Sequence, residues 1–69
     1  MSTAQLRESA REAERLFLWN SAACLWDKAI AAYPNGGRGA LAKRDIAQMK
    51  ERADSCRREL VAYIKSIGA

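Results

Sequence analysis

The sequence contains no histidine, one proline and only two cysteines in 69 residues. The missing histidine removes the commonest general base and the commonest ligand of transition metals. Ser21 and Ser55 have no candidate base, and the glycine-rich segment 36–39 lacks the pattern of a phosphate-binding loop. We therefore expect no enzyme, no catalytic residues, no metal site and no cofactor.

Long apolar runs are also missing. The longest uncharged run with bulky apolar side chains spans residues 16–26, about half of the ~20 residues that cross a bilayer. The first residues show no basic region followed by an apolar core, so no secretory signal is visible. We expect a cytoplasmic protein with no membrane contact. Cys24 and Cys56 form no C-x-x-C pair, and we expect two reduced, buried thiols.

The two halves of the chain differ in their balance of basic and acidic side chains. The first 37 residues hold four basic and four acidic side chains, whereas the remainder holds eight basic and four acidic ones. The whole net charge of +4 therefore lies beyond residue 37, where it would attract an acidic partner or nucleic acid. A chain this short buries only about 60% of its unfolded surface, so association with a partner is a natural expectation.

The helix-breaking residues are concentrated in one segment, residues 34–39, which holds the proline, an asparagine and three glycines. Both flanks have helical periodicity. The sequence predicts a single all-α domain over residues 1–69: a short helical hairpin at about 3–33, a glycine-rich loop at 34–39 and a longer third helix at about 40–67. Ser2 or Thr3 is the expected first N-cap, with Gln5 completing a capping box.

A change of phase in the first half predicts two helices there. One apolar stripe runs through Leu6, Ala10, Ala13 and Phe17, and a second begins at Trp19. The second continues through Ala22 or Ala23, Trp26, Ile30 and Tyr33. Because a straight helix would carry these stripes on different faces, we expect a turn near residues 16–21. A single long helix is the alternative, since neither Gly nor Pro marks the turn.

The second half carries a heptad-like stripe at spacings of four and three. Its members are Ala42, Ile46, Met49, Ala53, Cys56, Leu60, Tyr63 and Ile67. A helix of about 42 Å is roughly twice as long as either helix of the hairpin, so its end must extend past them. We expect residues 42–56 to pack on the hairpin and residues 60–67 to contact a partner or a second copy. The flanking charges, such as Asp45 opposite Lys50, favour a parallel homodimer.

The segment AERLFLWNSAACLWDKA at residues 13–29, with Arg52, Ala53 and Cys56, resembles the AraC negative regulator family and its PerC-like relatives. The best-matched positions are Ala13, Leu18, Trp19, Ala22, Ala23, Trp26, Ala29, Arg52, Ala53 and Cys56. The chain departs from the family pattern at Phe17, where a glycine is common, and it lacks the aromatic residue ahead of the R-A-x-x-C element.

The resemblance implies a small bacterial regulator of transcription. In the AraC negative regulator family such proteins bind AraC-type activators directly, and contacts with nucleoid-associated proteins are also described. The PerC-like relatives are regarded as activators of virulence promoters. We therefore expect regulation through protein contact.

The expected partner surface lies at the end of the third helix. It comprises Leu60, Tyr63, Ile64 and Ile67, with Arg57 and Arg58 steering the partner electrostatically. The alternative is a weak DNA-binding regulator that uses Lys43, Arg44, Lys50, Arg57 and Arg58. A third interpretation is a phage or plasmid protein that inhibits an unrelated host protein.

Overall fold

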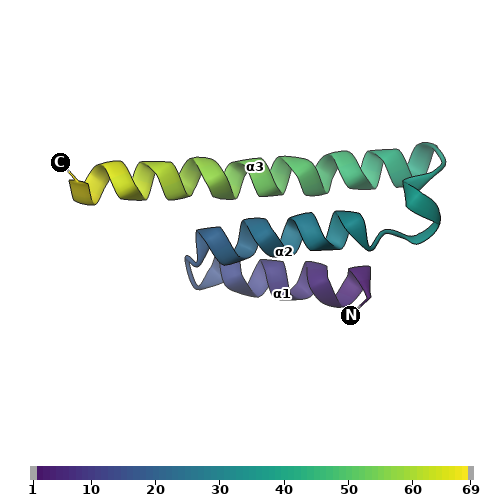
Figure 1. The fold of residues 1–69 in the computed structure, drawn as a ribbon, viewed down its shortest axis with the longest axis horizontal. Coiled ribbons are helices and arrows are strands. Elements are labelled where there is room, and N and C mark those ends of the chain that lie inside the picture. Colours follow the sequence, from purple (N-terminus) through teal and green to yellow (C-terminus); the bar gives the residue numbers. More distant parts are fainter. Residues whose placement is uncertain (1, 69) are drawn as a thin grey trace.

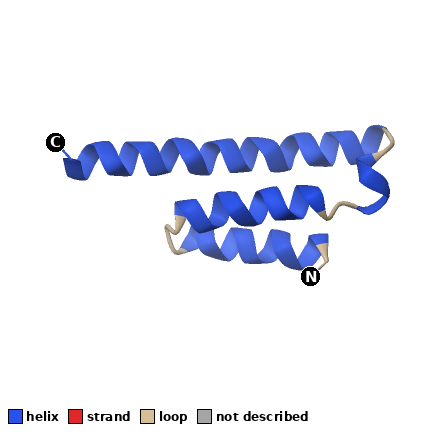
Figure 2. Ribbon diagram, in the orientation of Figure 1, coloured by secondary structure: helices blue, strands red, loops and turns tan. Residues whose placement is uncertain are grey.

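A computed structural model describes residues 2–68 of the chain. The helices are α1 (Thr3–Arg15), α2 (Trp19–Ala31) and α3 (Ala40–Gly68), and a short 3₁₀ turn, η1 (Pro34–Gly37), precedes α3. Residues 2–68 include no strand (Figures 1 and 2). The predicted all-α fold, with two helices followed by a longer third, is confirmed.

Helix α1 begins as the sequence predicts. The Ser2 hydroxyl accepts a hydrogen bond from the Gln5 backbone N–H at 3.2 Å, and the Gln5 side chain accepts one from the Ser2 N–H at 2.9 Å. This capping box satisfies two backbone donors that the first turn leaves without helical partners. The helix ends at Arg15. The first half is therefore two helices, and the alternative of one long helix is wrong.

Helix α2 forms the centre of the fold and packs against both α1 and α3 (Figure 1). Trp26, on α2, is only 2% exposed. Alanines around it allow the helix axes to approach closely. The buried apolar residues are Leu6, Ala10, Ala13, Ala22, Ala23, Trp26, Ala29, Met49, Ala53 and Cys56.

Polar contacts join α1 to α3 across this core. Glu14 accepts a hydrogen bond from the Trp26 indole N–H at 2.8 Å and forms an ion pair with Arg52. Asp45 accepts a hydrogen bond from the Tyr33 hydroxyl at 2.8 Å and lies 3.5 Å from the Arg7 guanidinium. These contacts fix the hairpin against the first half of α3.

The segment between α2 and α3 reverses the chain through left-handed backbone. Asn35, Gly36 and Gly37 have φ angles of 57°, 66° and 74°, which asparagine and glycine adopt more readily than other residues. Gly37 is buried, and an added Cβ would collide with the Ile46 side chain. The turn therefore brings the start of α3 close to the loop.

Helix α3 contains 29 residues, against 13 in each of α1 and α2. It extends well past the hairpin at its C-terminal end, and the molecule measures 45 × 21 × 14 Å (Figure 1). Met49, Ala53 and Cys56 are buried under the hairpin, whereas Tyr63 and Ile67 are exposed. The expected overhang is present. Within residues 2–68, no helix is both long and apolar enough to cross a membrane.

Two sequence predictions about burial are wrong. Phe17 does not continue the buried stripe of α1, because the helix ends before it. Cys24 is exposed while Cys56 is buried, so only one of the two thiols lies in the core. Cys24 is exposed because α2 presents Ala22, Ala23, Trp26 and Ala29 to its neighbours, and position 24 lies off that face.

Candidate partner-binding surface

The turn between α1 and α2 is a Schellman motif. The Leu18 N–H donates to the Ala13 carbonyl at 2.9 Å, and the Phe17 N–H donates to the Glu14 carbonyl at 3.0 Å. These bonds satisfy carbonyls at the helix end and require a left-handed residue between them, a position that glycine usually fills. Here Phe17 takes it, with φ at 60°.

Phe17 is strained and exposed at the same time. A left-handed conformation costs a residue with a side chain roughly 1–2 kcal/mol. Its ring is 74% exposed and makes one edge-on contact with Trp19, with ring centroids 5.7 Å apart. Leu16 and Leu18 on either side are exposed as well. The end of the hairpin therefore presents three consecutive large apolar side chains.

The turn and the overhang of α3 together form a groove. Phe17, Leu18 and Trp19 line one side, Leu60 and Tyr63 line the other, and the cavity volume is about 350 Å³. Asn20 and Ser21 add polar atoms to the lining. Leu60 and Tyr63 are sequence-predicted site residues. The structure brings these residues together with the turn, about forty residues away in the sequence.

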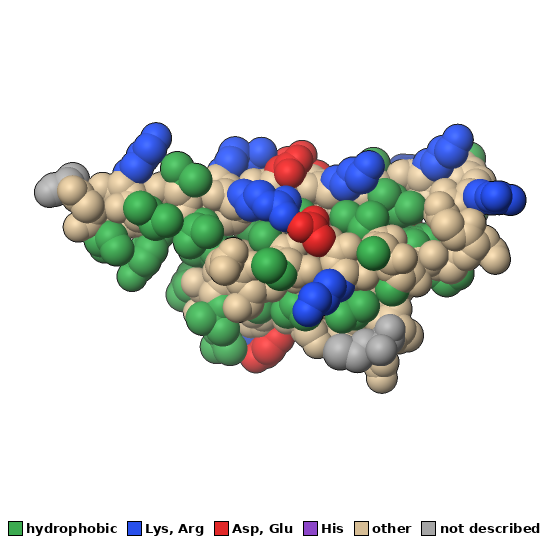
Figure 3. Space-filling view, in the orientation of Figure 1, with side chains coloured by type: hydrophobic (Ala, Val, Ile, Leu, Met, Phe, Trp, Pro, Cys, Tyr) green, Lys and Arg blue, Asp and Glu red, His purple; other side chains and the backbone are tan. Residues whose placement is uncertain are grey.

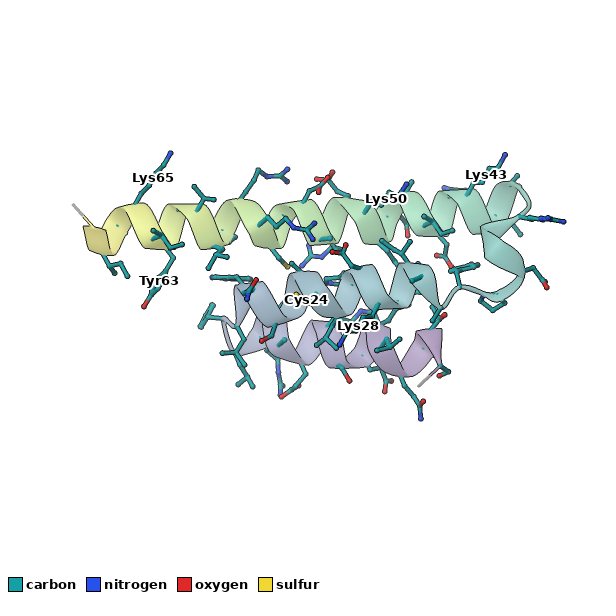
Figure 4. The ribbon with its side chains drawn as sticks, in the orientation of Figure 1. Cys24, Lys28, Lys43, Lys50, Tyr63 and Lys65 are labelled. Atoms are coloured by element: carbon teal, nitrogen blue, oxygen red, sulfur yellow. The ribbon has the colours of Figure 1, made fainter. Side chains whose placement is uncertain are left out.

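The rest of the overhang continues this apolar area. Ile67 is 68% exposed, and Val61, Tyr63 and Ile64 are each at least half exposed. Figure 4 shows that Tyr63 projects toward the hairpin side of α3, beyond the end of α1 and α2. In Figure 3, hydrophobic side chains cover this underside and the adjacent end of the hairpin. We call residues Leu16–Trp19, Leu60, Tyr63, Ile64 and Ile67 the apolar surface.

The predicted steering residues are engaged in ion pairs. Arg57 pairs with Asp27 of α2 and lies 3.8 Å from Asp54. Arg58 lies 3.2 Å from Glu51. Because nearby carboxylates cancel much of their charge, both arginines contribute less long-range attraction than the sequence suggests. Arg57 also fastens α3 to α2 at the point where the overhang begins.

The alternative nucleic-acid set divides into two groups. Lys43, Arg44 and Lys50 are exposed, and among residues 2–68 no carboxylate lies within 4 Å of them. Arg57 and Arg58 belong to the paired group described above. Lys43 and Lys50 project from the side of α3 that faces away from the hairpin (Figure 4).

The charge argument for a parallel dimer does not hold. It requires Asp45 to face Lys50 of a second copy, but Asp45 contacts Tyr33 and Arg7, and Arg52 on the same edge of α3 contacts Glu14. These intramolecular contacts occupy the flanks of α3 between residues 45 and 57. Within residues 40–68, the part of the apolar stripe that a second copy could cover is the overhang.

Among residues 2–68, the side chains with shifted pKa values are those of Cys56 and Tyr33, and both pack in or against the core. Burial, with the nearby Glu14 carboxylate, raises the pKa of the Cys56 thiol. The hydrogen bond to Asp45 raises the pKa of the Tyr33 hydroxyl. Residues 2–68 contain no group of three or more metal-ligating side chains. These perturbed groups lie apart from the apolar surface.

No protein-family model matches the chain, and the searches of curated proteins and of solved structures give no match. The function is therefore inferred from the geometry of the chain and from the residues that resemble the AraC negative regulator family.

Sequence reasoning missed the turn as part of the surface. The sequence predicts a turn near residues 16–21, but it places Phe17 in the apolar stripe of the first helix and assigns neither Leu16 nor Leu18 to a partner surface. The signal that could have identified them is Phe17 itself. It occupies a position where the resembling sequences often have glycine, which indicates a left-handed turn and hence exposed neighbours.

Proposed function

We propose that this protein is a small transcriptional regulator that acts by direct protein contact through the apolar surface. Its target is an AraC-type activator, which it antagonises, or a nucleoid-associated protein. The observation that carries the proposal is the groove in which Phe17, Leu18 and Trp19 of the turn face Leu60 and Tyr63 of the overhang.

The composition of this surface is typical of protein interfaces. Aromatic residues are enriched at the centres of interfaces and account for much of the binding free energy there. The surface offers Phe17, Trp19 and Tyr63, and large aliphatic side chains surround them. Packing of α2 and α3 and the Arg57–Asp27 ion pair hold the two sides in place. A partner therefore meets a largely pre-formed site.

The resemblance supports the choice of target class. Its matched residues include Ala22, Trp26, Ala53 and Cys56, which are buried and build the contact of α2 with α3. The resemblance therefore concerns the residues of the scaffold that presents the turn and the overhang. An inhibitor of an unrelated host protein, encoded by a phage or plasmid, would use the same surface, and the identity of the captured protein separates the two.

The test mixes the purified protein with an AraC-type activator from the same organism and measures both binding and the activator's occupancy of its promoter. The variant Tyr63→Asp with Ile67→Asp places two charges on the apolar surface. The matched control is Leu41→Asp, because Leu41 is 82% exposed at the opposite end of α3. Circular dichroism verifies that all variants are folded.

We expect the wild type and Leu41→Asp to bind the activator and displace it from DNA, and the double variant to do neither. Equal binding by the double variant would show that the apolar surface is not the binding site. A homodimer through the overhang is the alternative occupant. Analytical ultracentrifugation of the same variants measures it, and a dimer that the double variant dissociates would assign the surface to a second copy.

A further inference from the structure

The ion pairs of the fold sort its charged side chains into two classes. Six carboxylates, those of Glu12, Glu14, Asp27, Asp45, Glu51 and Asp54, accept contacts from Arg7, Arg15, Arg52, Arg57 and Arg58. Every cation in these pairs is an arginine. Within residues 2–68, the cations with no carboxylate within 4 Å are Arg11, Lys28, Arg38, Lys43, Arg44, Lys50 and Lys65.

Most of these unpaired cations lie on or next to α3, and three of them form a row. Lys43, Lys50 and Lys65 all project from the side of α3 that faces away from the hairpin (Figure 4). Figure 3 shows basic side chains along this edge of the molecule. At 1.5 Å per residue, the row is about 33 Å long, which is close to the ~34 Å of one turn of B-DNA. Because one continuous helix carries the row, it is straight.

We propose that this outer face of α3 binds the phosphate backbone of double-stranded nucleic acid without reading its sequence. Lysine places a point charge on a flexible stem and so reaches phosphates at several positions. Attraction between such charges and phosphates, with release of condensed counterions, is sufficient for non-specific binding. The two carboxylates nearest the row, Glu51 and Asp54, are paired with Arg58 and Arg57 and oppose it less.

The chemistry of the face favours nucleic acid over a membrane or an acidic protein. A membrane-binding helix inserts large apolar side chains beside its cations, and a protein interface buries an apolar centre. Tyr63, at the exposed end of α3, projects toward the hairpin side instead, whereas the half-exposed Val61 lies one turn from Lys65. Between Lys43 and Lys50 the exposed residue one turn along is Ala47. The outer face therefore offers charge with little apolar anchoring.

This binding differs from the DNA-binding alternative drawn from sequence. Arg57 and Arg58 leave the set because they are paired, Arg44 lies outside the row of three lysines, and Lys65 joins it. The face is also separate from the apolar surface, so the protein can hold nucleic acid and a protein partner at once. The inference does not depend on the proposed target, since it concerns another side of α3.

The test measures fluorescence anisotropy of a labelled random-sequence duplex DNA at salt concentrations between about 50 and about 200 mM. We expect affinity to fall steeply, with log K against log salt having a slope near −2.7 for three neutralised phosphates at about 0.9 each. Lys43→Gln, Lys50→Gln and Lys65→Gln should each reduce the slope by about 0.9, and the triple variant should lose measurable binding. Lys28→Gln is the matched control, because Lys28 is an exposed, unpaired lysine on α2.

Several results would overturn the inference. They are binding that is flat across the salt range, a triple variant that binds like the wild type, and an equal loss of slope in Lys28→Gln. Tighter binding to vesicles containing anionic phospholipid than to the duplex would assign the face to a membrane instead. Tyr63→Ser with Ile67→Ser, which adds no charge beside Lys65, should bind DNA normally, so failure of this inference and failure of the proposed partner surface give different results.

Discussion

The two halves of α3 carry the same apolar stripe in different surroundings. From Ala42 to Cys56 the stripe lies under the hairpin. Beside it, Asp45 contacts Arg7 of α1 and Tyr33, which precedes η1, and Arg52 contacts Glu14 of α1. From Leu60 to Ile67 the stripe continues at the same spacing but loses its cover. A repeating pattern therefore indicates a buried face without saying which molecule buries it. The helix lengths show that the hairpin does not cover the overhang, because α1 and α2 are too short to reach the end of α3.

The largest expected effect is on the free energy of unfolding, and it should occur in the half of α3 that the hairpin covers. Met49 is 1% exposed beneath the hairpin, so Met49→Ala should reduce the free energy of unfolding by about 2–5 kcal/mol. Ile67→Ala, on the overhang, should change it by less than about 0.5 kcal/mol. Urea denaturation followed by circular dichroism measures both. Comparable losses in the two variants would mean that the overhang contributes to the monomer's core.

Loss of a polar contact should likewise reduce stability more in the covered region than near the overhang. Glu14→Ala leaves the buried Trp26 indole without its acceptor and Arg52 without its partner, at a cost of about 1–3 kcal/mol in the free energy of unfolding. The matched control is Glu59→Ala, an exposed carboxylate just before the overhang stripe, which should cost less than about 0.5 kcal/mol. The same denaturation measurement applies. An unaffected Glu14→Ala variant would show that α1 is held by apolar packing alone.

The hydrogen bond from Tyr33 to Asp45, at the covered end of α3, should weaken at high pH. The Tyr33 hydroxyl donates to Asp45, and this contact raises its pKa above the unfolded value. The neutral hydroxyl therefore adds stability that is present below a pH of about 10 and is lost as the pH rises through the folded pKa. The stability difference between wild type and Tyr33→Phe should shrink in that window. Tyr63→Phe is the control, since among residues 2–68 no hydrogen bond of the Tyr63 hydroxyl is present, and a difference that stays constant with pH would contradict the assignment.

The smallest effect on stability is expected at the turn. Phe17→Gly relieves the left-handed strain of about 1–2 kcal/mol but loses the contact with Trp19, worth about 0.5–1.5 kcal/mol. The free energy of unfolding should therefore change by no more than about 1.5 kcal/mol, while binding of the protein partner weakens. Denaturation and a binding titration with the same sample separate the two. A variant that unfolds easily would show that Phe17 is structural.

The elements of the fold were predictable because each has a local signal. The Ser2–Gln5 capping box, the breakers at residues 34–39 and the heptad stripe of α3 all occur where sequence spacing places them. The site was predictable only in part. The spacing of Leu60, Tyr63, Ile64 and Ile67 identifies the overhang, but its contact with Phe17, Leu18 and Trp19 depends on how the hairpin packs. Likewise, ion pairs across helices, such as Arg57 with Asp27, have no signature in sequence spacing.

A pull-down from the native host lysate tests the proposed protein contact most directly. It is performed with and without nuclease and followed by mass spectrometry. Wild type, Tyr63→Asp with Ile67→Asp, and the triple Lys43→Gln, Lys50→Gln, Lys65→Gln variant would be compared. We predict that a specific transcription activator or nucleoid-associated protein stays bound to the wild type and to the lysine variant after nuclease treatment, and is absent with the aspartate variant. Loss of every partner on nuclease treatment, or equal capture by the aspartate variant, would contradict a regulator that acts through its apolar surface.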